Sequence, residues 1–371
     1  MRILSLSLDT HVIKPESVVA SRIRSYGEAV DLYTVIVPTE VSTKVVLSDK
    51  VQIYGVSGFT KLGTFFNVFF CARSLLRKHK YGVITTQDGY FLGVLGVLLS
   101  WLYDCGLEVQ SHGIEKDTVV RRNLARFVYA QADVVKTVST RLKNILTRRY
   151  KVSLDKIVVI PVFVDVSPLG LSSSGQHTQP KAKNDTFKNK YGQYINICSV
   201  SRLVPVKNIQ LQLVVLKKLV HTYPHVHLHI VGDGVEKSSL LNIVHTLGLE
   251  RYVTFHGRLL GTDLGALYNG CDIFVHTANS EGYGMVLIEA LHAGLPIVTT
   301  DVGCVGEIIH NEKNALVVPL GDTEAFANSL ETLIRDSKLR SALSTSGIAS
   351  ILKLQTFLED LHLKKRILIL R

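Results

Sequence analysis

Short apolar runs alternate with longer amphipathic stretches along most of the 371-residue chain, and this alternation limits the fold more than any other feature. Strands buried between two layers of helices read as continuous apolar runs. Besides a first strand at residues 1–6, we predict strands at Val83–Thr86, Leu107–Gln110, Val134–Val138, Ile157–Val162, Ile195–Val200, His227–Val231, Val253–His256, Ile273–His276, Pro296–Thr300 and Ala315–Val318. Helix-like segments such as Thr140–Tyr150 separate them. The pattern predicts a doubly wound α/β architecture.

A polar stretch without period divides the strands into two sets. Ser172–Pro180 and the following Lys181–Asn184 have the composition of a linker or a surface insertion. We therefore predict an N-terminal Rossmann-like domain over residues 1–166, a linker over 167–190 and a C-terminal domain over 191–351. Two such domains would face each other across a cleft, with ligands beyond the carboxyl ends of the strands.

Cysteine usage and hydropathy restrict the cellular setting. The five cysteines are odd in number and widely spaced, which argues against a disulfide framework or a zinc knuckle. Residues 1–6 have no signal-peptide layout. The longest uncharged run, Gly89–Tyr103, is shorter than the roughly 18–20 apolar residues that a membrane span needs. We expect a cytoplasmic protein that is soluble or attached to the inner face of a membrane.

The net charge of +11 is distributed unevenly. Residues 1–165 hold 22 Lys and Arg against 14 Asp and Glu, whereas residues 166–371 hold 20 against 17. A basic half predicts anionic partners, among them anionic lipid, nucleic acid and phosphorylated substrates. Nucleic acid is disfavoured because no reading motif is present. Phe59–Phe70, followed by basic residues at 73–80, fits an interfacial membrane helix or a core helix with a basic end.

Two cations lie in one strand-to-helix loop of the second half. Arg202 and Lys207 follow the strand Ile195–Val200 and precede an amphipathic helix. A helix N-terminus already favours anions, so two added cations suit a diphosphate. A basic surface loop is the alternative. The turn Val231-Gly232-Asp233-Gly234, after the next strand, allows close backbone approach to a ligand, or is simply a tight turn.

The segment 279–296 carries the strongest signal. A glycine-rich loop with Glu281, Gly282, Tyr283 and Gly284 precedes a helix that begins near Met285 and Val286 and carries Glu289. Two carboxylates thus flank a helix N-terminus whose amides suit a phosphate, and carboxylates accept hydrogen bonds from diols. The alternative makes Glu281 a helix cap and Glu289 a solvent-facing residue.

Taken in order, these motifs resemble the GT-B retaining glycosyltransferases of family 4. Glu281 and Glu289 are similar to the family's E-x7-E signature, and Arg202 and Lys207 to its R-x4-K pair. Val231–Gly234 is similar to its glycine turn, and further likeness runs from about residue 80 to 335. The resemblance implies a GT-B fold and the transfer of a sugar, with retention of configuration, from a nucleotide-diphosphate sugar to an acceptor.

The resemblance also implies roles for single residues. Arg202 and Lys207 would neutralise the diphosphate as it leaves, Glu281 would bind hydroxyls of the donor sugar, and Glu289 would bind the ribose diol. Backbone N–H groups of residues 282–286, with Gly232 and Gly234, would line the donor site. His112 matches a family histidine beside the donor sugar, although a lone histidine after a strand is more often structural. The chain has no D-x-D motif, so we expect no metal and no cofactor.

Departures from the family leave the acceptor open. Many relatives carry paired glycines in the first loop, but Leu8–Ser17 has none. The acceptor is therefore a glycan, a lipid-linked molecule or a small molecule. Relatives often return a final helix to the first domain, and residues 352–371 are the candidate for this. The altered first loop also suits an alternative function, a non-catalytic protein that binds sugar nucleotides or a membrane surface on a GT-B scaffold.

Overall fold

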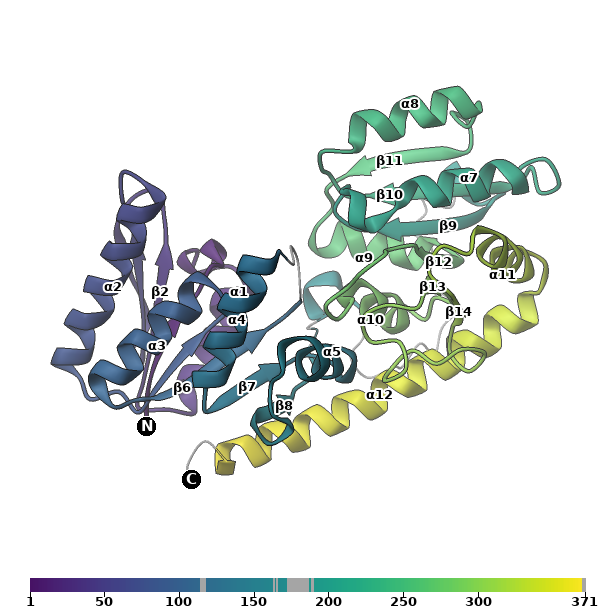
Figure 1. The fold of residues 1–371 in the computed structure, drawn as a ribbon. Helices are drawn as coiled ribbons and strands as arrows, with labels where there is room; N and C mark the ends of the chain where they lie inside the picture. Colours follow the sequence, from purple (N-terminus) through teal and green to yellow (C-terminus); the bar gives the residue numbers. More distant parts are fainter. Residues whose placement is uncertain (114–117, 163, 165, 172–186, 188–189, 369–371) are drawn as a thin grey trace. The chain divides into compact units, whose positions relative to one another are not determined.

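The chain folds into two compact α/β units in the computed structural model (Figure 1). The structure describes residues 1–371 except 114–117, 163, 165, 172–186, 188–189 and 369–371. The first unit comprises Met1–Pro161 with the last helical turns from Leu361, and the second comprises Val162–Asp360. Most of the predicted linker, including Ser172–Pro180, lies outside the described residues.

The first unit is built on an eight-stranded sheet in the order β3-β4-β2-β1-β5-β6-β7-β8. The strands are β1 (Arg2–Leu6), β2 (Leu32–Pro38), β3 (Thr43–Ser48), β4 (Val51–Val56), β5 (Val83–Thr86), β6 (Gly106–Ser111), β7 (Val134–Thr137) and β8 (Ile157–Val159). All neighbouring pairs are parallel except β3 and β4. The predicted strand Val83–Thr86 is confirmed to the residue, whereas β2, β3 and β4 were not predicted.

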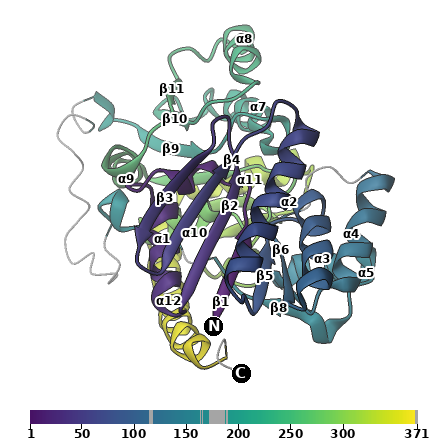
Figure 2. The same cartoon turned by 90° about the vertical axis from the view of Figure 1, so that its left-hand side faces the viewer.

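Helices α1 (Val18–Glu28), α2 (Lys61–Lys78), α3 (Phe91–Tyr103), α4 (Val119–Gln131) and α5 (Thr140–Tyr150) connect these strands. Threonine or serine side chains cap the N-termini of α2, α4 and α5, for example Ser139, which accepts a hydrogen bond from the Leu142 N–H. α3 packs between α2 and α4, and the three helices lie side by side against the sheet (Figures 1 and 2). The predicted helix Thr140–Tyr150 is confirmed to the residue.

The second unit contains a six-stranded, all-parallel sheet in the order β11-β10-β9-β12-β13-β14. The strands are β9 (Ile195–Val200), β10 (Val226–Val231), β11 (Val253–Gly257), β12 (Ile273–His276), β13 (Ile297–Thr300) and β14 (Leu316–Val318). This is the Rossmann order, in which the strand sequence reverses direction between β9 and β12. Ligands of such sheets bind outside the carboxyl ends of the strands at that reversal.

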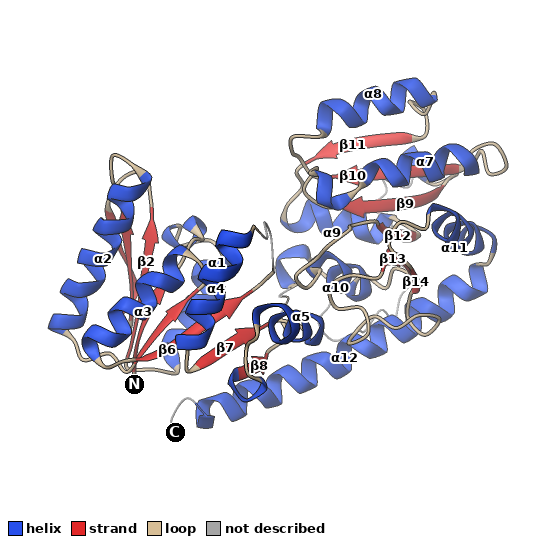
Figure 3. Ribbon diagram, in the orientation of Figure 1, coloured by secondary structure: helices blue, strands red, loops and turns tan. Residues whose placement is uncertain are grey.

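Helices of the second unit alternate with its strands as far as β13, and two further helices follow β14 (Figure 3). They are α7 (Ile209–Leu219), α8 (Lys237–Leu247), α9 (Gly261–Gly270), α10 (Met285–His292), α11 (Thr323–Arg335) and α12 (Ser337–Leu368). The core lies between sheet and helices, and Leu213, Ile273 and Phe326 are completely buried in it. Both units are therefore doubly wound α/β structures, as the alternation in the sequence predicted.

The long or apolar helices of the first unit do not have the character of membrane spans. α3 is strongly apolar but has 13 residues, and α2 has 18 residues with basic positions at its end. Over the described residues, no helix combines the length and the hydropathy needed to cross a bilayer.

Candidate functional site

The candidate site is formed by two loops at the carboxyl ends of β9 and β12, which are adjacent strands. The β9 loop contains Arg202 and Lys207, and the β12 loop contains Glu281. The Asn279 N–H donates a hydrogen bond to the Val206 carbonyl oxygen at 2.8 Å. This contact joins the two loops directly, so the reversal of strand order brings the predicted residues together.

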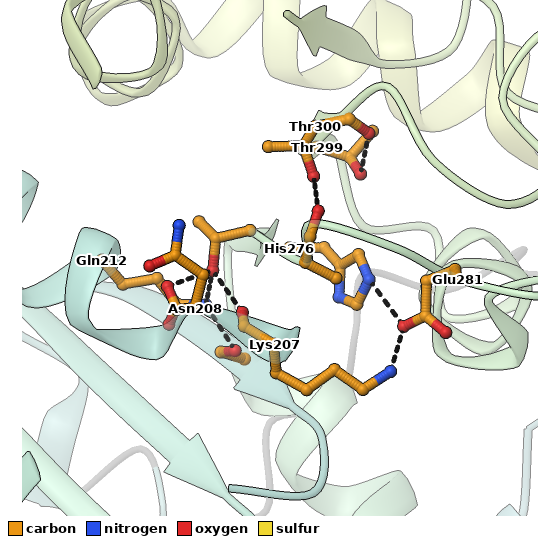
Figure 4. A network of polar contacts seen from close by, with 10 residues as sticks. Lys207, Asn208, Gln212, His276, Glu281, Thr299 and Thr300 are labelled. Carbon is orange, nitrogen blue, oxygen red and sulfur yellow. Dashed lines mark hydrogen bonds and ion pairs between the residues drawn. The ribbon is translucent and has the colours of Figure 1, made fainter. Parts of the chain in front are cut away.

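Buried side chains hold the β9 loop in place. The Thr277 hydroxyl donates to the carbonyl oxygens of Lys207 and Asn208, each at 3.0 Å. It accepts from Gln212 Nε2 at 2.9 Å, and Gln212 reaches it from the first turn of α7 (Figure 4). Thr277 and Gln212 are both buried. The backbone that carries Lys207 is therefore fixed by a network of side chains from a different loop and a helix.

Lys207 and Glu281 form an ion pair at the centre of the site. Lys207 Nζ donates to Glu281 Oε1, and His276 Nε2 lies 3.0 Å from the same oxygen (Figure 4). The side chains of Lys207 and Glu281 are only 12% and 13% exposed. Burial acts to raise the pKa of Glu281, but His276 and Lys207 outweigh it and hold that pKa below its ordinary value. Glu281 is therefore an ionised carboxylate paired with a largely buried cation.

Neither carboxylate occupies the position that the alternative interpretation required. Gly284 is the N-cap of α10, and no side chain caps that helix. Glu281 is thus not its cap. Glu289 is only partly exposed and accepts a hydrogen bond from the buried Tyr268 hydroxyl at 2.8 Å. Burial raises the pKa of Glu289 although Tyr268 acts to lower it. The side chain therefore points into the protein and does not face bulk solvent.

The glycine turn after β10 packs against the β9 loop. A Cβ atom on Gly232 would lie 1.8 Å from the Ser201 carbonyl oxygen, and one on Gly234 would lie 2.3 Å from that of Leu203. Gly232 has φ +135°, which side-chain-bearing residues rarely adopt. The Leu203 N–H donates to the Asp233 carbonyl oxygen at 2.9 Å. The turn therefore positions the loop that carries Arg202, and its predicted contact with a donor stays a prediction.

The N-terminus of α10 forms another side of the site. Gly284 has φ +88° and starts the helix, Tyr283 is buried, and Met285 is exposed at 44%. The Tyr283 carbonyl oxygen accepts from the Cys304 N–H at 2.8 Å, an approach that Gly303 permits because a Cβ atom there would lie 2.3 Å from that oxygen. The first N–H groups of a helix have no partner within it and attract anions. Gly282 and Val286 flank this terminus.

Two predicted residues take no part in the ion pair. Arg202 shares the β9 loop with Lys207, but its side chain is exposed, and the described residues show no ion pair between Arg202 and Glu281. His112 belongs to the first unit, where it follows β6 and is exposed. Its Nε2 lies 3.2 Å from Gln110 Oε1. Within the second unit, the structure therefore pairs Lys207 with Glu281 and carries Glu289 on α10, while His112 belongs to the first unit.

His276 was not among the predicted site residues. It is 2% exposed at the last position of β12, a strand that is otherwise apolar. A buried polar residue at the carboxyl end of a central strand was the only signal in the sequence, and it did not indicate that Glu281 would be its neighbour. In the described part of the chain, no group of three or more His, Cys, Asp or Glu could hold a metal ion.

Comparisons with known proteins match both halves of the chain to glycosyltransferases. Residues 180–349 match the family model of glycosyl transferases group 1, and residues 19–168 match that of glycosyltransferase family 4. The chain is 29% identical to N-acetyl-alpha-D-glucosaminyl L-malate synthase of Bacillus anthracis over 232 residues, which is 62% of this chain and 57% of that protein. The chain spans about half the length of the curated relatives it matches.

Solved structures extend the likeness to the whole fold. Sucrose-phosphate synthase of Thermosynechococcus elongatus superposes with a TM-score of 0.79 at 17% identity, over 99% of both chains. HepE of Anabaena in complex with UDP superposes with a TM-score of 0.74 at 20% identity, over 98% of this chain and 100% of that one. At these identities the likeness concerns the fold alone, and it confirms the predicted GT-B fold class.

Proposed function

We propose that this chain, which belongs to the GT-B glycosyltransferases of the group 1 and family 4 type, transfers a sugar from a nucleotide-diphosphate sugar to an acceptor. The acceptor is a glycan, a lipid-linked molecule or a small molecule, and the reaction retains the configuration of the sugar without a metal ion. We place the reaction in the cytoplasm. The proposal rests chiefly on one observation, the largely buried Lys207–Glu281 pair beside the N-terminus of α10.

The ion pair suits a donor that carries both a diphosphate and a sugar. In the structure, the ammonium of Lys207 and the carboxylate of Glu281 satisfy each other. A bound donor would offer phosphate oxygens to Lys207 and sugar hydroxyls to Glu281, so each charge would exchange one strong partner for another. His276 would continue to orient Glu281. The same pair can therefore recognise both parts of the donor.

Charge stabilisation supplies the chemistry in this proposal. As the bond between the anomeric carbon and the diphosphate oxygen breaks, negative charge develops on the diphosphate, and Lys207, Arg202 and the α10 N-terminus would stabilise it. The acceptor oxygen would form its bond on the face that the diphosphate leaves, and a diphosphate oxygen would take the acceptor proton. This sequence retains configuration and requires no protein nucleophile. Glu289 would accept hydrogen bonds from the ribose diol, in place of or beside Tyr268.

Calorimetric titration with UDP, GDP and ADP sugars in the presence of a chelator tests the donor site. We expect one base to bind, and Lys207→Ala or Glu281→Ala to weaken that binding about tenfold to a hundredfold, as the loss of a charge-assisted hydrogen bond does. Lys218→Ala is the matched control, since it removes an exposed ion pair with Glu324 in the same unit. If the wild type binds no donor better than the Lys207 and Glu281 variants, the donor-site assignment is wrong.

The alternative function is a non-catalytic protein that binds sugar nucleotides. One specific observation favours it, because Leu8–Ser17 contains no glycine and forms a 3-10 helix at Thr10–Ile13, with Asp9 as its N-cap. Release of free nucleotide diphosphate in the presence of mixed glycan and lipid acceptors separates the two functions. Turnover supports transfer, and the anomeric configuration of the product, read by NMR, tests retention. Tight donor binding without turnover supports the alternative.

A further inference from the structure

An exposed apolar surface extends over three neighbouring helices of the first unit. It consists of Phe66 and Phe70 on α2, Leu98, Trp101 and Leu102 on α3, and Phe127 on α4, and we call it the α2–α4 face. These side chains are between 41% and 62% exposed. α3 packs between α2 and α4 (Figures 1 and 2). The Trp101 and Phe127 rings meet edge to face with centroids 6.2 Å apart. The face is therefore continuous across at least α3 and α4.

Single exposed apolar residues are normal on a soluble domain, but a contiguous group is not. α2, α3 and α4 each bury a different set of apolar side chains against the unit, for example Val68, Leu95 and Val128. Packing within the unit is thus already satisfied by the inward sides of these helices. The outward aromatic and leucine side chains need a different explanation, such as a partner that covers them.

The charges on the helices around the face have one sign, and the exposed Asp104 at the C-cap of α3 is an acidic residue beside them. α2, α3, α4 and α5 contain eleven Lys and Arg and no Asp or Glu. α3, at the centre, carries no charge at all, whereas Arg73 and Arg77 on α2 are exposed beside it. On the opposite side, α4 carries Arg121, Arg122 and Arg126. An apolar centre bordered by cations is the arrangement of a surface that inserts shallowly into a membrane with anionic headgroups.

The same charges argue against other partners. A second copy of the chain would have to bring two identical basic surfaces together, and like charges would oppose that contact. A protein partner would need a strongly acidic surface with an apolar centre. Leucine side chains such as Leu98 and Leu102 gain nothing from nucleic acid phosphates, but they gain free energy in the acyl boundary of a bilayer.

We propose that the α2–α4 face docks on a bilayer that contains anionic lipid, with Trp101 and its apolar neighbours at the headgroup boundary and the cations against the headgroups. The inference deepens the acceptor side of the proposed function, and it rests on that function for its purpose: docking would hold the enzyme where a lipid-linked acceptor is presented.

Trp101 reports directly on this contact because it is the only tryptophan in the chain. It is 60% exposed, so its emission in the free protein should be that of a solvated indole. With vesicles of phosphatidylglycerol and phosphatidylcholine at low salt, we expect the emission to shift to shorter wavelength and to be quenched by brominated acyl chains. Vesicles of phosphatidylcholine alone should produce a much smaller change, and added salt should reverse part of the binding.

Variants that keep Trp101 test the face itself. We expect Leu98→Ser with Leu102→Ser to weaken binding to the anionic vesicles by about tenfold or more, since both side chains lose apolar burial. Arg73→Gln with Arg77→Gln should weaken binding and reduce its salt dependence. Leu241→Ser with Leu320→Ser is the matched control, because these leucines are 45% and 51% exposed in the second unit and should leave binding unchanged.

Several results would overturn the proposal. They are an unchanged Trp101 emission with anionic vesicles at low salt, equal binding to uncharged vesicles, and an equal loss in the control variant. A blue shift that depends on protein concentration without lipid would assign the face to a second copy instead. Circular dichroism checks that each variant is folded. The vesicle assay contains no donor and calorimetry contains no lipid, so failure of membrane docking and failure of the donor site are separate outcomes.

Discussion

Replacing Lys207 by methionine tests the central contact of the site. The substitution keeps most of the length of the side chain and removes its charge. The Glu281 carboxylate is then left with His276 as its polar neighbour. Both partners are almost nine-tenths covered, and the Lys207 ammonium donates directly to Glu281 Oε1. The interaction is therefore shielded from solvent far more than a surface ion pair.

The expected strength of the Lys207–Glu281 interaction follows from that burial. Two unit charges about 4 Å apart attract by roughly 4 kcal/mol at an effective dielectric constant near 20. Desolvation of both groups removes much of this gain, and charge-assisted hydrogen bonds have net values of about 1.5–3 kcal/mol. We therefore expect a coupling free energy between Lys207 and Glu281 of about 1.5–3 kcal/mol.

A double-mutant cycle measures this coupling. Urea unfolding at pH 7, followed by circular dichroism, is compared for the wild type, Lys207→Met, Glu281→Gln and the double variant. The matching cycle for Lys218 and Glu324, which are 50% and 70% exposed, should give a coupling below about 1 kcal/mol. A coupling between Lys207 and Glu281 that is no larger than that of the exposed pair would refute the reasoning.

The pH dependence of the coupling free energy supplies a second check on the Lys207–Glu281 pair. The pKa of Glu281 is lower in the folded protein than its ordinary value, so the folded state favours the ionised carboxylate. Such a group stabilises the fold above the pKa it has when unfolded, near 4.3, and this stability is lost as the pH falls through the folded pKa. The coupling should therefore be constant between pH 5 and 7 and fall in more acidic buffer. A coupling that grows on acidification would contradict the assignment.

Three further predictions use the same unit. Gly232→Ala should lower the free energy of unfolding by about 3 kcal/mol or more and abolish donor binding, because its Cβ atom would meet a carbonyl oxygen of the β9 loop at 1.8 Å. Gly248→Ala is the control: Gly248 has φ +64° but open space around it, so this variant should lower the free energy of unfolding by only about 1–2 kcal/mol. Glu289→Gln should raise the stability of the protein at pH 7 in the absence of donor, because burial raises the pKa of the Glu289 carboxyl and so disfavours its charged form. Thermal melts should show that this gain in stability shrinks as the pH falls below the pKa of Glu289 in the folded protein. Calorimetry should show weaker nucleotide binding by the variant. Thr277→Val should cost about 1–3 kcal/mol in urea unfolding and weaken donor binding, since it removes the hydroxyl that fixes the Lys207 backbone, whereas Thr277→Ser should restore most of both.

Sequence patterns predicted the central strands best. β5, β9 and β12 match their predicted bounds to the residue, because they are buried along nearly their whole length and read as short, mainly apolar runs. β3 escaped prediction because it is antiparallel to β4 and its residues are mostly exposed or partly exposed. An edge strand of this kind has no continuous apolar run to mark it.

The sequence by itself determined the class of fold and the order of the motifs, because apolar periodicity and short glycine or acidic signatures are local properties of the chain. It also placed Lys207 and Glu281 among the candidate residues. Only the tertiary structure decided that these two side chains pair, that His276 joins them and that Glu289 meets Tyr268. Lys207 and Glu281 are 74 positions apart, and they meet because β9 and β12 are neighbours in the sheet, a pairing that no local pattern encodes. The α2–α4 face arose in the same way, since only the packing of three helices shows which of their apolar side chains remain outside.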